Sequence, residues 1–252
     1  MSRPPPRLFV DTALADNQSV MLEGNAAHYL NNVLRLKPGA HVLLFNGRDG
    51  EWSAEISGSS RKTCDFILKT QTRPQEPRQS LTLAFAPLKK TAMHFLVEKA
   101  TELGVGTLCP VITERTETNR INLDRMQAQA QEAAEQCERL TVPGVETAQP
   151  LDEFVKAWPE TDPLWMGDET GGGENLINAL QAHSTGMTPT ARHGFLIGPE
   201  GGFTANELAS LDALHFVNRV DLGPRILRAE TAALAALTCW QALLGDWQRL
   251  NQ

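Results

Sequence analysis

The sequence has little of what marks a secreted, membrane-spanning or metal-binding protein. Its four cysteines are widely separated and form no CxxC pair, which argues against a zinc site and a disulfide framework. Free thiols are typical of a reducing compartment, so we expect a cytoplasmic protein. No apolar run approaches the roughly 20 residues that span a bilayer, and the first residues lack the apolar core of a signal peptide. The six histidines show no metal-ligand spacing, so no metal is expected.

Positive charge is also scarce. The chain has 23 Lys and Arg against 30 Asp and Glu, a formal net charge of -7. That balance does not favour RNA as a partner, because phosphate contacts need Lys and Arg. Residues 1–72, however, hold 8 Lys and Arg against 7 Asp and Glu, or +1, which leaves -8 for residues 73–252. The charge therefore permits an RNA partner bound through local basic patches, with the N-terminal part contributing.

Short apolar segments separated by turns make up residues 1–72. Strands are predicted at residues 8–10, 40–45, 52–56 and 66–68, with Asn46-Gly47 as a tight turn. One helix is predicted over residues 26–36, before Lys37-Pro38-Gly39. We expect a small β-barrel here, followed by a polar, proline-containing linker at residues 71–78.

Strands and helices alternate after the linker. This alternation predicts an α/β domain with a mostly parallel sheet that is covered on both faces. Gly104 is expected to end a helix, and Thr204-Ala205-Asn206-Glu207 to form a capping box. The strands are predicted at 81–88, 107–112, 163–166, 195–197 and 216–222, and the longer helices at 92–103, 123–140 and 229–247.

Three glycine-bearing segments, at 166–169, 197–202 and 222–228, each follow a predicted strand. Parallel sheets bind ligands outside the carboxyl ends of their strands, and glycine there lets the backbone approach a flat ligand. A single such loop would be an ordinary tight turn, but three on successive strands favour one shared pocket. None of them is GxGxxG or GxxxxGK[ST], which argues against dinucleotide and P-loop chemistry.

Arg228 lies between the third loop and a helix that opens with Glu230-Thr231. Its planar fork of donors suits a carboxylate, a phosphate or a developing oxyanion. An ordinary surface pair with a glutamate near the helix start is equally compatible with the sequence. Glu200, in the second loop, has its own plain interpretation as a solvated carboxylate that caps its turn.

Several of these segments resemble one known family. FLIGPEGGF at 195–203 and LGPRILRAETA at 222–232 resemble the signature loops of the RsmE-type 16S ribosomal RNA uridine-N3 methyltransferases, which belong to the SPOUT class of knotted methyltransferases. Residues 98–105, 113–116 and 135–139 are also similar to the family. Residues 28–30 and 33–39 resemble its PUA-like domain. The resemblance covers nearly the whole chain.

The resemblance implies a fold and a cofactor. The fold would be a PUA-like RNA-binding β-barrel domain at 1–72 and a SPOUT methyltransferase domain at 73–252, with a parallel sheet and a C-terminal trefoil knot from about Gly194. The knotted loops would bind S-adenosyl-L-methionine. The residues expected at that site are Met166, Gly167, Ile197, Gly198, Pro199, Glu200, Gly201, Leu222, Gly223, Ile226, Leu227 and Thr231.

The implied reaction is methylation of N3 of a specific uridine, uridine 1498, in 16S rRNA of the small ribosomal subunit. N3 must first lose a proton, which leaves negative charge on the base, and Arg228 is our candidate to stabilise that charge. Arg228 stays protonated, so it cannot be the base. Glu200, Glu230 or a water could accept the proton, and the sequence does not choose among them.

RNA contacts and a second subunit are also expected. The resemblance implies a homodimer, and the small apolar residues of 232–237 indicate a helix buried either in the core or in a subunit interface. Every candidate RNA contact also has an ordinary interpretation as a surface or core residue. These candidates are Arg7, His28, Arg35, Lys37, Arg48 and Lys89.

Three other functions stay open at this point. The same pocket could methylate another RNA, such as transfer RNA. The chain could be an RNA-binding module without catalysis, although RNA binding needs neither the glycine loops nor Arg228. A small-molecule α/β enzyme without an RNA partner would suit the acidic charge.

Overall fold

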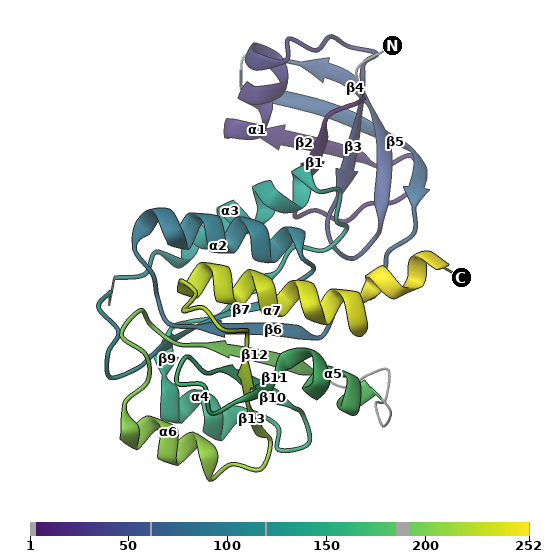
Figure 1. Ribbon diagram of the computed structural model, residues 1–252. Helices are drawn as coiled ribbons and strands as arrows, with labels where there is room; N and C mark the ends of the chain where they lie inside the picture. Colours follow the sequence, from purple (N-terminus) through teal and green to yellow (C-terminus); the bar gives the residue numbers. More distant parts are fainter. Residues whose placement is uncertain (1–3, 61, 119, 185–191, 252) are drawn as a thin grey trace. The chain divides into compact units, whose positions relative to one another are not determined.

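The computed structural model describes residues 4–60, 62–118, 120–184 and 192–251, and its contacts divide the chain into two units (Figure 1). Unit 1 comprises Met1–Arg78 and Ala134–Val142, and unit 2 comprises Gln79–Ala133 and Pro143–Gln252. The boundary after residue 78 falls six residues beyond the predicted one after residue 72. The return of a later segment to unit 1 has no signal in the sequence pattern.

Unit 1 is built on a five-stranded sheet in the order β1-β3-β4-β5-β2. The pairing of β1 with β3 is parallel and the other three pairings are antiparallel. This order leaves β1 and β2 as edge strands, so the predicted barrel is not closed by strand pairing among the described residues. The strands are β1 (Arg7–Phe9), β2 (Ser19–Glu23), β3 (His41–Phe45), β4 (Glu51–Ser59) and β5 (Thr63–Arg73).

The helix predicted over residues 26–36 is shorter than expected. It consists of α1 (Gly24–His28) and the π-helical turn η1 (Tyr29–Val33). Arg35, two residues after η1, has a φ of 54°, a left-handed conformation through which a helix cannot continue. β2, which was not predicted, pairs with β5 and brings Val20 into the core of unit 1.

Arg7 attaches the segment Ala134–Val142 to unit 1. Its guanidinium donates to the carbonyl of Ala134 at 2.9 Å and to the carbonyl of Arg139, and it lies 3.6 Å from the centre of the Phe45 ring. It also forms an ion pair with Glu51 at 2.6 Å, and the Arg7 side chain is only 7% exposed. The sheet of unit 1 therefore holds a segment that follows it by more than sixty positions in the sequence.

Unit 2 contains an eight-stranded sheet in the order β11-β13-β10-β12-β6-β7-β8, with β9 paired to β7 beside that path. Every described pairing in it is parallel, which confirms the predicted class of sheet. All residues of β6 and β12 are buried, as central strands covered on both faces require. The strands are β6 (Leu81–Phe85), β7 (Thr107–Ile112), β8 (Gly144–Val145), β9 (Gln149–Pro150), β10 (Leu164–Gly167), β11 (Glu174–Asn175), β12 (His193–Ile197) and β13 (Val217–Asp221).

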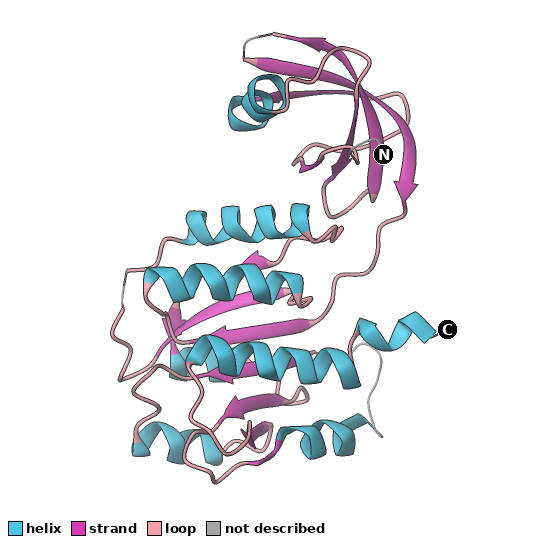
Figure 2. Ribbon diagram, turned by 45° about the horizontal axis from the view of Figure 1, so that its top comes forward, coloured by secondary structure: helices cyan, strands magenta, loops and turns pink. Residues whose placement is uncertain are grey.

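Helices cover this sheet (Figure 2). α2 and α7 lie side by side, while Phe154 of α4 and Leu211 of α6 pack in one cluster with Met166 and Leu196 of the strands (Figure 1). None of the helices among the described residues is long and apolar enough to cross a membrane. The helices are α2 (Lys90–Glu102), α3 (Leu123–Gln136), α4 (Leu151–Ala157), α5 (Leu176–Ser184), α6 (Ala205–Asp212), α7 (Ala229–Leu243) and the 3-10 turn η2 (Asp246–Asn251).

The end of α2 and the start of α6 match their predictions, whereas the helix predicted over 229–247 ends early, at Leu243. Gly104 follows α2 with a φ of 86°, and Thr204 begins α6 with a complete capping box to Glu207. The helix predicted over 123–140 also ends early, at Gln136, and Glu138 then adopts a φ of 61°.

Candidate functional site

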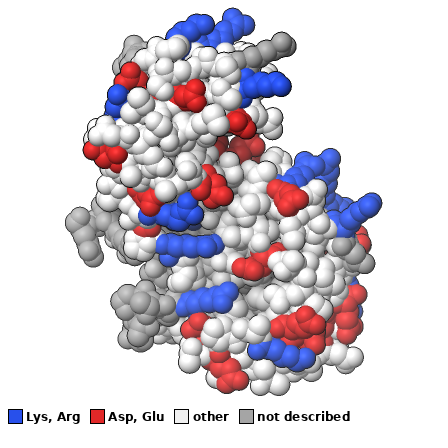
Figure 3. All heavy atoms as spheres, turned by 180° about the vertical axis from the view of Figure 1, so that it is seen from behind, with Lys and Arg blue, Asp and Glu red and all other residues white. Residues whose placement is uncertain are grey.

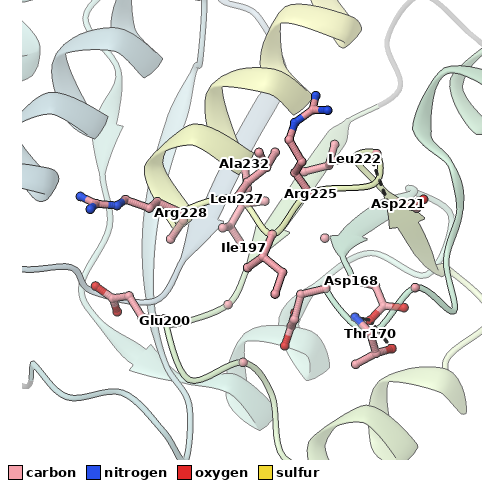
Figure 4. A pocket seen from close by; sticks show the side chains of 18 of the residues that line it. Asp168, Thr170, Ile197, Glu200, Asp221, Leu222, Arg225, Leu227, Arg228 and Ala232 are labelled. Carbon is pink, nitrogen blue, oxygen red and sulfur yellow. Dashed lines mark hydrogen bonds between the residues drawn. The ribbon is translucent and has the colours of Figure 1, made fainter.

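A cavity of about 470 Å³ opens at the carboxyl ends of three strands of unit 2 (Figure 4). β13, β10 and β12 are direct neighbours in the sheet, so the three glycine-bearing loops that follow them reach the same edge. The start of α7 completes the wall. The lining residues are Gly167, Asp168, Glu169, Thr170, Gly171, Ile197, Gly198, Pro199, Glu200, Gly202, Asp221, Leu222, Gly223, Pro224, Arg225, Ile226, Leu227, Arg228, Ala229 and Ala232.

Nine of the twelve residues expected to bind the cofactor line this cavity, and three do not. Met166 is fully buried in the core, because its side chain points into the layer between the sheet and α4 and α6. Gly201 faces the side chain of Arg115, whose Cβ and Cδ would each lie 3.5 Å from a Cβ at this position. Thr231 is exposed on the first turn of α7.

Ten lining residues were not assigned to the site individually, although five of them fall inside the three glycine-bearing segments predicted to share a pocket. Most stand beside predicted ones, and the acidic and polar residues of the first loop look like ordinary turn formers in the sequence. Their only available signal was position, directly after a predicted strand and next to a glycine. The missed residues are Asp168, Glu169, Thr170, Gly171, Gly202, Asp221, Pro224, Arg225, Ala229 and Ala232.

The first loop is organised by the buried carboxylate of Asp168. One oxygen accepts hydrogen bonds from the backbone N–H of Thr170 at 2.9 Å and from its hydroxyl at 2.7 Å. The other accepts from the N–H of Gly172 at 3.0 Å and from Arg219 at 2.8 Å. Burial raises the pKa of Asp168, but the hydrogen bonds from Thr170 and Arg219 outweigh it, so the net shift is downward and the carboxylate is ionised.

The second loop is held from outside the cavity. Arg115 donates to the carbonyl of Gly201 at 2.8 Å and to that of Phe203 at 3.3 Å. The Glu207 carboxylate accepts from the N–H of Thr204 and from that of Glu114, both at 2.8 Å. The turn after β7 therefore fixes the backbone that carries the second group of lining residues.

The third loop needs glycine at one position. Gly223 has a φ of 108°, and nothing lies within 4 Å of where its Cβ would be, so its backbone faces open space. The Asp221 carboxylate accepts from the Gly223 N–H at 2.9 Å. Ile226 is 89% exposed, an unusual position for a large apolar side chain on a loop that lines a cavity.

Arg228 and Glu200 extend toward the same side of the cavity (Figure 4). Neither takes part in an ion pair among the described residues, so the Arg–Glu surface pair that the sequence allowed for Arg228 is not formed there. Glu230, the other candidate proton acceptor, does not line the cavity. Arg228 and Glu200 thus place one cation and one carboxylate at this side of the cavity, and both side chains are exposed to an entering ligand.

The six candidate RNA contacts are placed differently. His28, Arg35 and Lys37 are exposed at and after the α1–η1 turn of unit 1. Arg48 is exposed and donates to the carbonyl of Asp11 at 3.0 Å. Lys89, in unit 2, forms an exposed ion pair with Glu117 at 3.3 Å.

Arg7 stands apart from these candidates, because its guanidinium is buried against Glu51 and backbone carbonyls and is not presented to a ligand. On the face drawn in Figure 3, Lys and Arg are interspersed with Asp and Glu rather than gathered in one basic field. Any RNA contact on that face would therefore depend on individual cations. No group of three or more potential metal ligands is found among the described residues.

Two family models match the chain. An RNA methyltransferase domain matches residues 74–241, and an RNA methyltransferase PUA domain matches residues 22–69. The fold and the matches define the class: an RNA methyltransferase catalytic domain preceded by a PUA domain.

Curated relatives narrow the class. Ribosomal RNA small subunit methyltransferase E of Rickettsia conorii is 33% identical over 92% of this chain and 93% of its own length. The protein of the same name from Synechocystis is 34% identical over 94% of this chain and 78% of its own length. The chain belongs to the ribosomal RNA small subunit methyltransferase E family.

Solved structures agree with this family. The ribosomal RNA small subunit methyltransferase E of Neisseria gonorrhoeae, bound to S-adenosyl methionine, is 30% identical with a TM-score of 0.84, covering 96% of this chain and 99% of that one. A methyltransferase of Legionella pneumophila in complex with the same cofactor is 27% identical with a TM-score of 0.82, covering 95% and 98%.

Proposed function

We propose that the protein transfers a methyl group from S-adenosyl-L-methionine to N3 of a specific uridine in 16S rRNA of the small ribosomal subunit. The observation that carries the proposal is the cavity at the ends of β10, β12 and β13, in a chain 30% identical to a relative whose structure holds this cofactor. Because small subunits are cytoplasmic, the reaction would take place there.

The cavity suits this cofactor in size and chemistry. Its volume of about 470 Å³ lies in the range typical of small-molecule sites. Ile197, Leu222 and Leu227 offer apolar surface for an adenine ring, and the backbone at Gly223 is open to a close approach. When bound, the cofactor supplies an electrophilic methyl group on a cationic sulfur. The carboxylates around the cavity favour that positive charge electrostatically.

Arg228 and Glu200 are assigned complementary tasks at uridine. Removal of the N3 proton leaves negative charge on the base, and the fixed positive charge of Arg228 stabilises it. Glu200 extends toward the same side of the cavity and accepts the proton, directly or through one water (Figure 4). Glu230 is left out, because it does not line the cavity.

We propose that RNA is positioned by exposed cations of both units. In unit 1, His28, Arg35 and Lys37 lie beside the π-helical turn in the sequence, and Arg35 itself has a left-handed φ; both features are enriched at functional sites. A flipped uridine would then enter the cavity of unit 2. The proposed contacts are His28, Arg35, Lys37, Arg48 and Lys89.

Two architectural expectations are part of the proposal. The chain from about Gly194 onward would thread a trefoil knot, which is compatible with β12 lying between β10 and β6 while β13 lies beyond β10. The protein would act as a homodimer, as the family resemblance implies. Light scattering of the purified protein would report a mass of two chains, and a monomer active at the same concentration would refute the dimer.

Methyl transfer from radiolabelled S-adenosyl-L-methionine tests the substrate. Small subunits whose 16S rRNA lacks N3-methyluridine, naked 16S rRNA and bulk transfer RNA are offered in parallel. We expect label in the small-subunit RNA. Label confined to transfer RNA would keep the cofactor site and overturn the target. Binding of RNA without label in any substrate would indicate a non-catalytic RNA-binding module.

A further inference from the structure

We propose that Asp168, which forms an ion pair with Arg219, is a positioning residue that holds residues 168–173 in the conformation that the cofactor requires. This inference rests on the proposed function, and it assigns a role to a buried pair that takes no part in the chemistry. Asp168 and Arg228 lie on opposite sides of the cavity (Figure 4). The pair therefore acts on cofactor binding and not on the charge that develops on the base.

The segment that follows β10 has little intrinsic rigidity. It contains the glycines 171, 172 and 173, and Gly171 has a φ of 80°. Glycine-rich backbone loses more conformational entropy on ordering than other backbone does, and a ligand that had to order it would bind more weakly. A loop of this composition needs anchors within the protein in order to present a preformed wall.

Asp168 supplies those anchors from one side chain that is 1% exposed. Its two oxygens bind the N–H groups of Thr170 and Gly172, and so fix the backbone two and four residues ahead. A Cβ at Gly172 would lie 3.3 Å from the carboxylate and 3.2 Å from Arg219, so the turn closes tightly around the pair. Arg219 neutralises the charge of Asp168, and both carboxylate oxygens are already hydrogen-bonded to groups of the protein.

Arg219 connects this turn to the rigid sheet. It stands on β13, in register with Met166 of β10, two residues before Asp168. Its guanidinium binds Asp168 through two nitrogens, at 2.8 and 3.2 Å, and the hydroxyl of Thr170 at 2.9 Å. A third nitrogen binds Asp212, at the end of α6, at 3.1 Å. Loop, strand and helix thus meet at one guanidinium.

The test compares Asp168→Asn and Thr170→Val with wild type in the full-length protein. Binding of S-adenosyl-L-methionine is measured by calorimetry, kcat and KM by methyl transfer, and the free energy of unfolding by urea. Hydrogen bonds to a charged group are stronger than those between neutral groups, so their loss should weaken cofactor binding. We expect the Kd for S-adenosyl-L-methionine to rise about 10-fold to 100-fold in Asp168→Asn and about 3-fold to 10-fold in Thr170→Val. We expect kcat at saturating cofactor to stay within about 3-fold, because Arg228 is untouched.

Asp152→Asn is the matched control, since it removes the same charge from an exposed pair with Lys156. It should bind cofactor as wild type does. If Asp168 only supports the fold, Asp168→Asn loses unfolding free energy while its folded form keeps the wild-type Kd, and the proposal fails. Thr170 is exposed, so we expect Thr170→Val to fold, and its cofactor Kd tests the proposal even if Asp168→Asn does not fold. Wild type that binds no S-adenosyl-L-methionine would overturn the proposed function itself, and this inference with it.

Discussion

Arg228 lies at the edge of the cavity, and the chemistry proposed here depends on it more than on any other side chain. Replacing it by alanine removes a fixed positive charge where negative charge develops. We expect kcat to fall by about 100-fold to 1000-fold, as for the loss of one preorganised electrostatic contact. Cofactor Kd should change little, because Arg228 is proposed to act on the base and not on the cofactor. Single-turnover methyl transfer and calorimetry give the two values.

The control for Arg228→Ala is Arg125→Ala, an equal loss of charge on the exposed start of α3, remote in sequence from the three loops. It should leave kcat and Kd unchanged. Full activity in Arg228→Ala with intact cofactor binding would remove Arg228 from the mechanism.

His193 is a buried titratable residue on β12, at the strand end opposite to the second glycine loop. It is 2% exposed, its ring stacks on Trp165 with centres 5.3 Å apart, and its Nδ1 has no hydrogen-bond partner within the part of the chain that the structure describes. Burial lowers the pKa of His193 to about 4, and the nearby His183 adds to this effect. The unfolded chain takes up this proton near pH 6.5, whereas the folded chain does so only near pH 4. The free energy of unfolding is therefore highest above pH 6.5 and decreases as the pH falls toward 4.

His193→Phe should remove that pH dependence. In wild type, this one residue makes the free energy of unfolding fall by up to about 1.4 kcal/mol per pH unit between pH 6.5 and about 4. Urea titrations at several pH values give the slope for each variant. His215→Phe, the same change at an exposed site, should keep the wild-type slope. An unchanged slope in His193→Phe would show that other groups cause the acid sensitivity.

At the scale of elements, α6 is fixed to its surroundings by Glu207. The capping box predicted from Thr204 and Glu207 is formed, but the same carboxylate also accepts from the Glu114 N–H in the turn after β7. Thr204→Ala should cost about 1 kcal/mol, as a lost N-cap does. Glu207→Ala should cost about 2 to 3 kcal/mol, because it leaves a second N–H without its partner. Equal losses in the two variants, measured by urea unfolding, would contradict the bridging role.

An element can be predicted from the sequence when the residues that determine it lie close together in the chain. Strands β7 and β12, the box that begins α6 and the glycine after α2 carry their signals within a few residues, and these predictions hold. The missed elements are short and depend on partners distant in the chain; they are α4, α5, β2 and the two-residue strands β8, β9 and β11. Met166 was assigned to the cavity by position, yet it is buried in the core layer. Which face a side chain joins at the end of a strand is decided by packing that the sequence does not display.

At the scale of the molecule, the boundary between units was the hardest feature to predict. The return of Ala134–Val142 to unit 1 depends on Arg7, an N-terminal residue that was expected to bind RNA. Arg7→Met leaves Glu51 buried without its partner, and we expect a loss of about 3 to 5 kcal/mol in the free energy of unfolding. Arg48→Met, at an exposed site, is the control. Wild-type stability in Arg7→Met would show that the apolar contacts of the segment suffice.

The atom that receives the methyl group can be identified in one measurement. Wild-type protein is incubated with labelled S-adenosyl-L-methionine and small subunits that lack N3-methyluridine, and the digested nucleosides are resolved by mass spectrometry against N3-, C5- and 2′-O-methyluridine standards. We expect a single labelled product that matches N3-methyluridine and is strongly reduced in Arg228→Ala. A product methylated at carbon or at the ribose would contradict the proposed reaction, because neither reaction removes the N3 proton that the proposed roles of Arg228 and Glu200 require.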